Sequence, residues 1–237
     1  MQALTTGSGG IPSSPWELRD PHQVHPGVDL ACVGADLDPV TVLHAYAMGL
    51  FPMRVDTELG EQELGWWSPD PRGILRLDEV KVSRSLRRSM QKFTVTFDQD
   101  FVRVMRACWR AGGEGNWITG EFVQTYSDLH DCGFAHSVEV WNSEGELAGG
   151  LYGIELGGLF AGESMFHIDR DASKVALVTL VEKLAHCVGP RLFDVQWHTD
   201  HLDSMGVTQI DRGDYLKELA RVLTTKPCFS PGRSDLL

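Results

Sequence analysis

The chain has 237 residues, and its 21 basic and 33 acidic side chains give a net charge of −12 at pH 7. This length suits one large domain or two smaller ones around a buried core. Hydrophobic residues make up 42% and charged residues 23%, a composition that excludes a disordered chain. The acidic balance argues against a protein that coats nucleic acid through its overall charge, but it leaves room for a local basic patch.

The cysteines and the apolar stretches indicate the cellular compartment in which the protein is expected. The cysteines are odd in number, lie far apart and form no C-x-x-C pair, which favours a reducing cytoplasm. Residues 1–14 lack the positive charge and the apolar run of a signal peptide. The longest apolar stretch, 149–162, is interrupted by Glu155 and is too short to span a bilayer. We therefore expect a cytoplasmic protein without membrane contacts. The cysteines are Cys32, Cys108, Cys132, Cys187 and Cys228.

A change of composition near residue 70 predicts a small N-terminal domain (1–69) and a larger domain (70–237). The elements predicted in the first part are a loose tail (1–14), a helix that opens at Asp38 and Pro39 and ends at Gly49 and Pro52, an acidic loop (54–63) and a rigid turn (66–73).

The second part alternates strands and helices and predicts an α+β fold, a mixed sheet with covering helices. The predicted strands are 74–77, 94–97, 135–141, 147–156, 159–164 and 192–198, and the predicted helices are 83–90, 101–110, 122–132, 172–187 and 215–223.

Short histidine and cysteine spacings give little support to a metal or a nucleophile. The spacings His198-x-x-His201 and His130-x-Cys132-x-x-x-His136 join no second pair, so we interpret these histidines as structural or capping. A cysteine nucleophile needs an identifiable base, and none is recognisable. Neither a G-x-S-x-G elbow nor a G-x-x-x-x-G-K-[ST] loop occurs. We predict no bound metal.

A glycine-rich stretch from Arg110 to Gly115 matches R-x-x-G-x-G, the loop by which GNAT acetyltransferases hold the pyrophosphate of acetyl-CoA. Such a loop should follow a central strand and open a helix. Here it follows a helical pattern and precedes Trp117, so we interpret it as a connector. A CoA-dependent N-acetyltransferase stays open as an alternative.

A basic patch lies between residues 80 and 97, where no acidic residue occurs. Arg84 and Arg88 are four positions apart on a predicted helix, and Arg87 follows Arg84 by three. In an acidic chain this patch indicates a contact with nucleic-acid phosphates, although a solvated helix face explains it equally well on its own. The five cations are Lys81, Arg84, Arg87, Arg88 and Lys92.

Aromatic residues flank the polar loops. Trp66, Trp67, Trp117 and Tyr126 lie outside smooth apolar runs, and they either pack in the core or stack on a nucleobase. For one of the pair Trp66 and Trp67 we expect core packing.

Three polar residues stand at strand positions. Glu163 ends one predicted strand. Asp194 and Gln196 are two apart in a buried strand and share one face of the sheet, while Phe193 and Val195 face the other way. A buried acid is costly unless it is paired or used, so Asp194 is either satisfied by backbone donors or functional.

In chain order, these stretches resemble the leucyl/phenylalanyl-tRNA–protein transferase family. The resemblance extends over about residues 26–220, and its most specific parts are WWSPDPR (66–72) and GESMF (162–166). The other matching stretches are 30–37, 44–52, 83–85, 117–119, 135–141, 149–153, 172–174 and 194–196.

The resemblance implies a small N-terminal domain packed on a GNAT-like acyltransferase domain that uses no acetyl-CoA. It implies transfer of Leu or Phe, and less well Met, from tRNA to proteins that begin with Arg or Lys, which creates a degradation signal. An aminoacyl ester is already activated and an α-amine has an ordinary pKa of about 7.7–8.0, so holding the two together supplies much of the acceleration. We expect a monomer that needs no cofactor and binds no DNA.

By resemblance, Asp194 orients or deprotonates the amine, Gln196 binds near the carbonyl, and Glu163 holds the aminoacyl end or the incoming cationic residue. Trp117 and Tyr126 match positions near the terminal adenosine, and the basic patch faces the acceptor stem. The implied apolar pocket for the Leu or Phe side chain consists of Leu151, Phe160, Leu180 and Phe193.

The chain departs from the family pattern at three positions near the tRNA end. Met53 stands where a Trp available for stacking is frequent, and a thioether gives less contact. His167 replaces a usual Ser, and Gly120 replaces a basic residue. These departures concern adenosine binding rather than the reaction. The second alternative is a catalytically silent tRNA-binding protein, which an Asp194→Ala variant with all function intact would favour.

Overall fold

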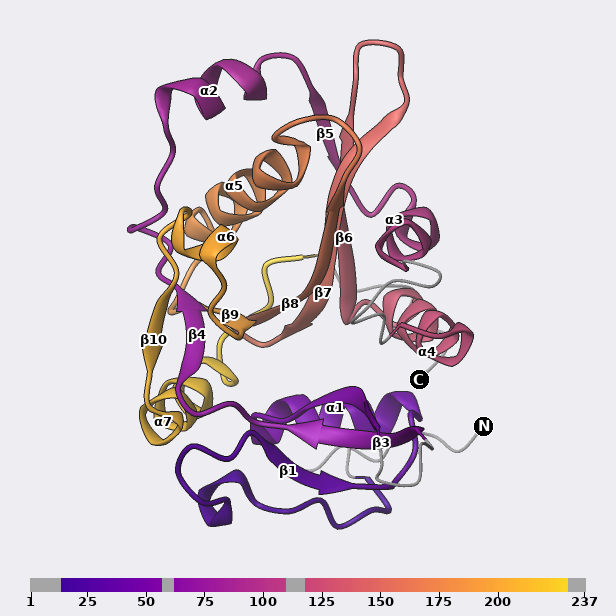
Figure 1. Cartoon of the computed structure of the whole chain (residues 1–237), viewed down its shortest axis with the longest axis vertical. Helices are drawn as coiled ribbons and strands as arrows, with labels where there is room; N and C mark the ends of the chain where they lie inside the picture. The colour runs from indigo at the N-terminus through magenta and orange to yellow at the C-terminus, as the bar shows by residue number, and fades with distance from the viewer. Residues whose placement is uncertain (1–13, 57–61, 110–117, 230–237) are drawn as a thin grey trace.

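The computed structural model describes residues 14–56, 62–109 and 118–229. Within them the chain forms two sheets (Figure 1). A three-stranded sheet has the order β1-β3-β2, and a seven-stranded sheet has the order β10-β4-β9-β8-β7-β6-β5. Neighbouring strands are antiparallel except for β8 and β9, which makes the larger sheet mixed.

The small sheet and its helix come from the first part of the chain. They comprise η1 (Pro21–Gln23, a 3-10 turn), β1 (Leu30–Val33), α1 (Pro39–Met48), β2 (Phe51–Asp56) and β3 (Gln62–Trp67). Helix α1 begins and ends as predicted. The Asp38 carboxylate accepts the Val40 N–H at 2.9 Å, and Gly49 ends the helix with a left-handed φ of 87°.

Two predictions about this part are wrong. The stretch 54–63 is more than an acidic loop, because β2 runs into it and β3 begins within it. The stretch 66–73 is not a turn throughout, since it contains the end of β3 and the start of β4. Trp66 is fully buried in β3, where its indole N–H donates to the Gly34 carbonyl at 2.9 Å, so it is the core residue of the tryptophan pair.

The larger sheet contains every strand predicted after residue 70, with ends that shift by a few residues. Its strands are β4 (Arg72–Leu75), β5 (Thr94–Phe97), β6 (Ala135–Trp141), β7 (Leu147–Leu156), β8 (Leu159–His167), β9 (Leu192–Gln196) and β10 (Thr208–Ile210). The helices are α2 (Arg84–Met90), α3 (Phe101–Cys108), α4 (Gly120–Asp131), α5 (Ala172–Ala185), α6 (Asp200–Asp203) and α7 (Arg212–Val222). The short elements α6 and β10 were not predicted.

The larger sheet separates two apolar clusters. One contains the apolar face of α5, and the other contains residues of α1, α3, α4 and α7. Figure 1 shows α5 on one side of β6–β8 and α3 and α4 on the other. Neighbouring residues of β7 show the alternation, because Leu151 packs in the α5 cluster and Tyr152 in the opposite one.

Strand β8 has two irregular features. Its parallel pairing with β9 ends where Ala161 meets Asp194, although both strands continue. Its antiparallel pairing with β7 shifts by one residue, because Gly162 and Ser164 have consecutive partners on β7 and Glu163 has none. Glu163 is therefore the extra residue of a β-bulge, a device that redirects a side chain.

A buried arginine at the start of α7 joins the two sheets. Arg212 is 5% exposed and donates to the carbonyls of Val28 at 2.8 Å and Ser68 at 2.7 Å. Its backbone N–H donates to the Asp70 carboxylate at 3.0 Å. Because these partners lie on the chain segments around the small sheet, Arg212 fixes that sheet against the larger one.

A disulfide joins Cys187, just after α5, to Cys228 near the end of the described chain. The interpretation of the cysteines as those of a reducing compartment did not predict this bond and does not agree with it. None of the helices in the described ranges combines the length and apolar character needed to cross a membrane.

Candidate active site

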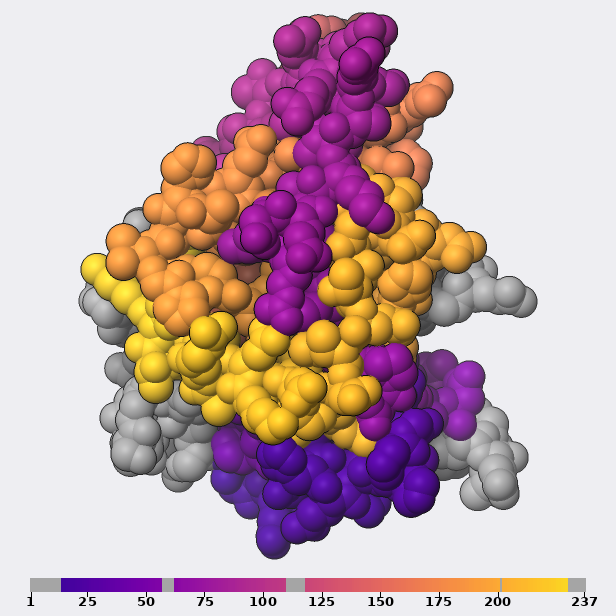
Figure 2. All heavy atoms as spheres, turned by 90° about the vertical axis from the view of Figure 1, so that its left-hand side faces the viewer, coloured from indigo at the N-terminus to yellow at the C-terminus, as the bar shows by residue number. Residues whose placement is uncertain are grey.

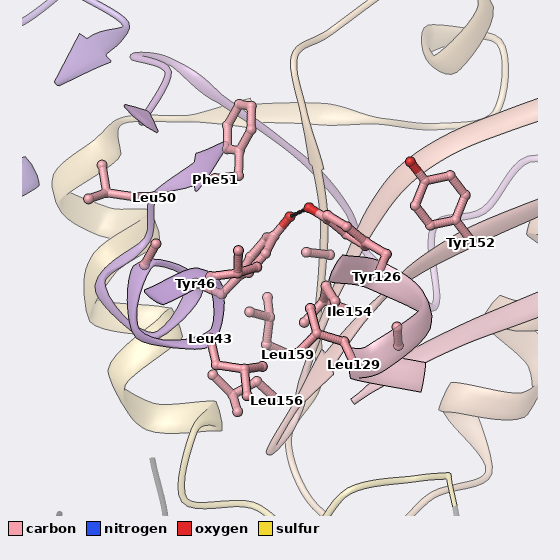
Figure 3. Packing of buried hydrophobic residues seen from close by; sticks show 14 of the residues in the cluster. Leu43, Tyr46, Leu50, Phe51, Tyr126, Leu129, Tyr152, Ile154, Leu156 and Leu159 are labelled. Carbon is pink, nitrogen blue, oxygen red and sulfur yellow. Dashed lines mark hydrogen bonds between the residues drawn. The ribbon is translucent and has the colours of Figure 1, made fainter. Parts of the chain in front are cut away.

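Glu163 lies at the centre of a buried hydrogen-bonded network. The Tyr46 hydroxyl donates to Glu163 Oε1 at 2.6 Å, and the Gln196 side-chain amide donates to the same oxygen at 3.0 Å. The Tyr126 hydroxyl lies 3.3 Å from Oε2 and 2.8 Å from the Tyr46 hydroxyl. Figure 3 shows the two tyrosines pointing toward each other from α1 and α4. The network thus connects the helices α1 and α4 to the strands β8 and β9 at one carboxyl group.

The surroundings of Glu163 keep its proton bound. Burial and the nearby charge of Asp194 raise its pKa to about 8, although the hydrogen bonds from Tyr46 and Tyr126 and the charge of Arg72 act in the opposite direction. Burial also raises the pKa of both phenols well above their ordinary value. At neutral pH the three groups are therefore mostly uncharged and can exchange hydrogen bonds as donors and acceptors.

We expect Glu163→Gln to remove a pH dependence of stability. The pKa of Glu163 is about 8 in the folded protein against 4.5 ordinarily, so between these values the folded state holds a proton that the unfolded chain has lost. The free energy of unfolding of the wild type should fall as pH rises from 5 to 8, by at most about 1.4 kcal/mol per pH unit from this group. Urea titrations at each pH measure it. Parallel curves for wild type and variant would contradict the expectation.

Asp194 is paired with a buried arginine. Arg72 donates from Nε to Oδ1 at 2.9 Å and from Nη2 to Oδ2 at 2.6 Å. Oδ1 also accepts the Gln196 backbone N–H at 2.9 Å, and Oδ2 accepts the Tyr215 hydroxyl at 2.9 Å. Each carboxylate oxygen thus accepts two hydrogen bonds. The acid is satisfied by a cation, a phenol and one backbone donor rather than by backbone donors alone.

Arg72 is itself held on all sides. Its side chain is 1% exposed, its Nη1 donates to the Gly49 carbonyl at 3.2 Å, and its guanidinium carbon lies 4.9 Å and 4.4 Å from the ring centroids of Phe51 and Tyr215. The ion pair therefore fixes β9 and β4 against the end of α1 and against α7.

Gln196 combines a strained backbone with a place in the polar network. Its φ of 66° lies in the left-handed region, which a side chain with a Cβ rarely adopts. The backbone N–H is held by Asp194, and the side chain reaches Glu163 across the point where β8 and β9 cease to pair. Strain of this kind concentrates at functional sites, which supports Gln196 as a contact of the reacting group.

The structure brings the four predicted pocket residues together on the α5 side of the sheet. All four are buried in one cluster, and the rings of Phe160 and Phe193 meet edge to face at 5.7 Å. Phe193 and Asp194 are consecutive in β9 and point to opposite faces. The apolar cluster and the polar network therefore lie in different layers and approach each other where the pairing of β8 with β9 ends. The four residues are Leu151, Phe160, Leu180 and Phe193.

Comparison with known proteins bears on what this arrangement does. A family model described as leucyl/phenylalanyl-tRNA protein transferase matches residues 74–220, and the model of its N-terminal domain matches 35–70. The chain belongs to this family. The transferase of that name from Hahella chejuensis is 44% identical over 219 residues, which are 88% of this chain and 91% of that protein. The one from Pseudomonas fluorescens is 47% identical over 210 residues, 87% of this chain and 88% of that protein.

Two solved structures are also similar. The structure of L-PGS from Bacillus licheniformis has a TM-score of 0.39, 13% identity, and covers 56% of this chain and 49% of its own. A tandem GNAT protein from the clavulanic acid biosynthesis pathway has a TM-score of 0.38, 16% identity, and covers 76% and 60%. These scores are too low to carry an argument. The predicted α+β class is confirmed by the two sheets with their helices and by the family's N-terminal model. A division after residue 69 stays a prediction.

The residues predicted to lie near the end of the tRNA differ in how far they are buried. Met53 is half-buried on β2, and its carbonyl accepts the Trp67 indole N–H at 3.1 Å. Tyr126 is fully buried, and its hydroxyl faces Glu163 rather than the surface. Trp117 and the stretch 110–115 lie outside the described residues. A contact of Met53 or Tyr126 with adenosine stays a prediction.

The five predicted phosphate contacts are all exposed on α2 and the residues beside it. The Ser83 hydroxyl accepts the Leu86 N–H at 3.1 Å and begins the helix, while the buried Leu86 side chain turns the cations outward. Within the described ranges, none of the five forms an ion pair with an acidic side chain. In Figure 2 the segment that carries α2 forms the upper end of the visible face.

Two histidines from the spacings that resemble metal-binding motifs, His130 and His136, contact protein groups instead. His130 Nδ1 lies 2.8 Å from the Ala135 carbonyl, and His136 Nδ1 lies 2.8 Å from the Asp98 carboxylate. In the part of the chain that the structure describes, no three His, Cys, Asp or Glu side chains are grouped as metal ligands.

Three residues of the site escaped the sequence analysis. Arg72 and Tyr46 belong to the matching stretches 66–72 and 44–52 but received no role, and Tyr215 was assigned only to a helix. The partner Asp194 is 122 residues from Arg72, so no local pattern could have shown the pair.

Proposed function

We propose that the protein transfers Leu or Phe, and less well Met, from aminoacyl-tRNA to the N-terminal Arg or Lys of acceptor proteins, which then carry a degradation signal. The observation that carries this proposal is the position of Gln196, strained and bonded to Glu163, at the junction of the polar network and the apolar cluster. Membership of the transferase family supports the reaction type. We place the reaction in the cytoplasm.

The chemistry needs little from the protein beyond placement. The α-amine of the acceptor attacks the ester carbonyl, a C–N bond forms, the ester C–O bond breaks, and the departing ribose oxygen receives the proton that the amine loses. Gln196 donates its amide N–H to the carbonyl oxygen as negative charge develops there. Glu163 holds that amide, and the apolar cluster holds the Leu or Phe side chain.

In this mechanism Asp194 acts as a positioning residue. Its two oxygens already accept four hydrogen bonds, including the backbone N–H of Gln196, which favours orientation over deprotonation of the amine. The two hydrogen bonds from Arg72 hold the carboxylate in a fixed orientation. Asp194 therefore sets where Gln196 presents its amide.

A transfer assay tests the reaction and the acceptor rule together. Phe-tRNA or Leu-tRNA with a labelled amino acid is incubated with peptides that begin with Lys, Arg or Ala, without ATP or CoA. We expect label on the Lys and Arg peptides and none on the Ala peptide. Binding of tRNA without any transfer would favour a silent tRNA-binding protein. A parallel incubation of the same peptides with acetyl-CoA and no tRNA tests the acetyltransferase alternative, which acetylated peptide would favour.

The basic face of α2 predicts a salt-dependent contact with tRNA. We expect the double variant Arg87→Ala, Arg88→Ala to reduce the slope of log K against log salt by about two units, one for each phosphate that the variant no longer neutralises. The exposed Arg106 on α3 provides the matched control, since Arg106→Ala should leave the slope unchanged. Filter-binding titrations with aminoacyl-tRNA at several salt concentrations measure it, and equal slopes in all three proteins would exclude α2 from the contact.

A further inference from the structure

The last described segment, Cys228 and Phe229, packs beneath the predicted side-chain pocket. The disulfide to Cys187 holds it against the end of α5. Both backbone N–H groups of the segment donate to the Glu155 carboxylate on β7, from Cys228 at 2.6 Å and from Phe229 at 2.9 Å. Glu155 is 3% exposed, so the segment closes over a buried acceptor and is held at defined points.

The Phe229 side chain fills a defined place in the apolar cluster on the α5 side. It is 7% exposed, and its ring stacks on His136 at 4.1 Å and meets Phe97 at 5.8 Å. The Lys183 ammonium lies 4.5 Å from its centroid. These contacts come from β6, from β5 and from α5, so they fix the position of the ring.

The contact that matters for the substrate is the one with Phe160. The ring of Phe229 lies 6.1 Å from that of Phe160, which in turn meets Phe193 at 5.7 Å. Phe160 and Phe193 are residues of the proposed pocket, and Phe193 immediately precedes Asp194 in β9. Phe229 thus supports the pocket wall from behind, in a segment beyond the residues that the family model matches.

We propose that Phe229 is a positioning residue that sets the depth of the side-chain pocket and thereby the preference between Leu and Phe. This inference rests on the proposed function. A Phe side chain is longer than a Leu side chain, and a pocket whose wall cannot retreat favours the shorter one. Removing the supporting ring lets Phe160 move back and admits the longer side chain more easily.

The test compares kcat/KM for Phe-tRNA and for Leu-tRNA in the full-length protein. We expect Phe229→Ala to raise the ratio of Phe to Leu transfer about tenfold, the range that one or two methylene-sized changes in an apolar pocket produce. Phe229→Leu, a milder change that retains an apolar side chain, should raise the ratio less. Glu155→Gln removes one of the two backbone anchors and should shift the ratio in the same direction.

Phe101→Leu is the control for loss of packing alone. Phe101 is as buried as the pocket residues but belongs to the cluster on the opposite face. The Phe101→Leu variant should lower the midpoint of thermal unfolding and leave the ratio of Phe to Leu transfer unchanged. An unchanged ratio in Phe229→Ala and Phe229→Leu, with the wild type active, would overturn the inference. If Phe229→Ala does not fold, the transfer ratios of Phe229→Leu and Glu155→Gln test the inference in its place. A wild type that transfers neither amino acid would overturn the proposed function, and this inference with it.

Discussion

Gln196→Gly should lower kcat/KM for aminoacyl transfer about a hundredfold, the usual effect of removing one donor to a developing oxyanion. The same change should leave the free energy of unfolding within about 1 kcal/mol of the wild type. Glycine adopts a positive φ without strain, and this gain offsets the missing hydrogen bond to Glu163. A large loss of activity without a loss of stability would identify Gln196 as a contact of the reacting group.

Steady-state transfer kinetics and urea titrations measure the two effects. The control is Gln209→Ala, since Gln209 is exposed on the edge strand β10 and should affect neither quantity. The role of Gln196 is contradicted by a Gln196→Gly variant with wild-type kcat/KM. A variant that loses activity only in proportion to its unfolded fraction would show a structural role instead.

Arg72→Met should be the most destabilising of these single substitutions, because it leaves the Asp194 charge buried without its cation. Breaking a buried ion pair in this way lowers the free energy of unfolding by about 3–5 kcal/mol. The matched control is Arg76→Met. Arg76 forms an equally short pair with Glu218 at 2.6 Å, but its side chain is 37% exposed, so the loss should be about 1 kcal/mol or less.

A second variant separates charge burial from packing. Adding Asp194→Leu to Arg72→Met removes the unpaired charge and should recover part of the missing stability. Urea titrations followed by far-ultraviolet circular dichroism measure all three proteins. Equal losses for Arg72→Met and Arg76→Met, or no recovery in the double variant, would show that the buried pair does not anchor the fold.

Elements whose boundaries are marked by neighbouring residues were predicted correctly from the sequence. Helix α1 has its cap and its terminating glycine in the sequence. Strands β6 and β7 are buried runs on either side of a short turn, so their bounds agreed with the prediction. The hairpin of β2 and β3 was missed, because Pro52 and the acidic stretch argue for a loop while the stabilising partner, β1, is distant in sequence.

The polar residues of the site could be predicted from the sequence, but the hydrogen bonds between them could not. The resemblance and strand alternation identified Glu163, Asp194 and Gln196 as candidates. The β-bulge that turns Glu163 toward Gln196 depends on the register between β7 and β8, which one sequence does not contain. The same holds for Tyr46, whose hydroxyl contacts a carboxyl group 117 residues away.

The place where β8 and β9 stop pairing forms a seam through the sheet rather than a groove on its surface. In the proposed mechanism an aminoacyl group with its carbonyl at Gln196 and its side chain beside Phe193 would occupy both layers and pass through this seam. Beyond Ala161 the two strands have no ladder hydrogen bonds between them, and the bond from Gln196 to Glu163 spans the gap at 3.0 Å. In the proposed mechanism the arriving carbonyl would therefore meet an amide that Glu163 already holds in place across this gap, through the second N–H of Gln196.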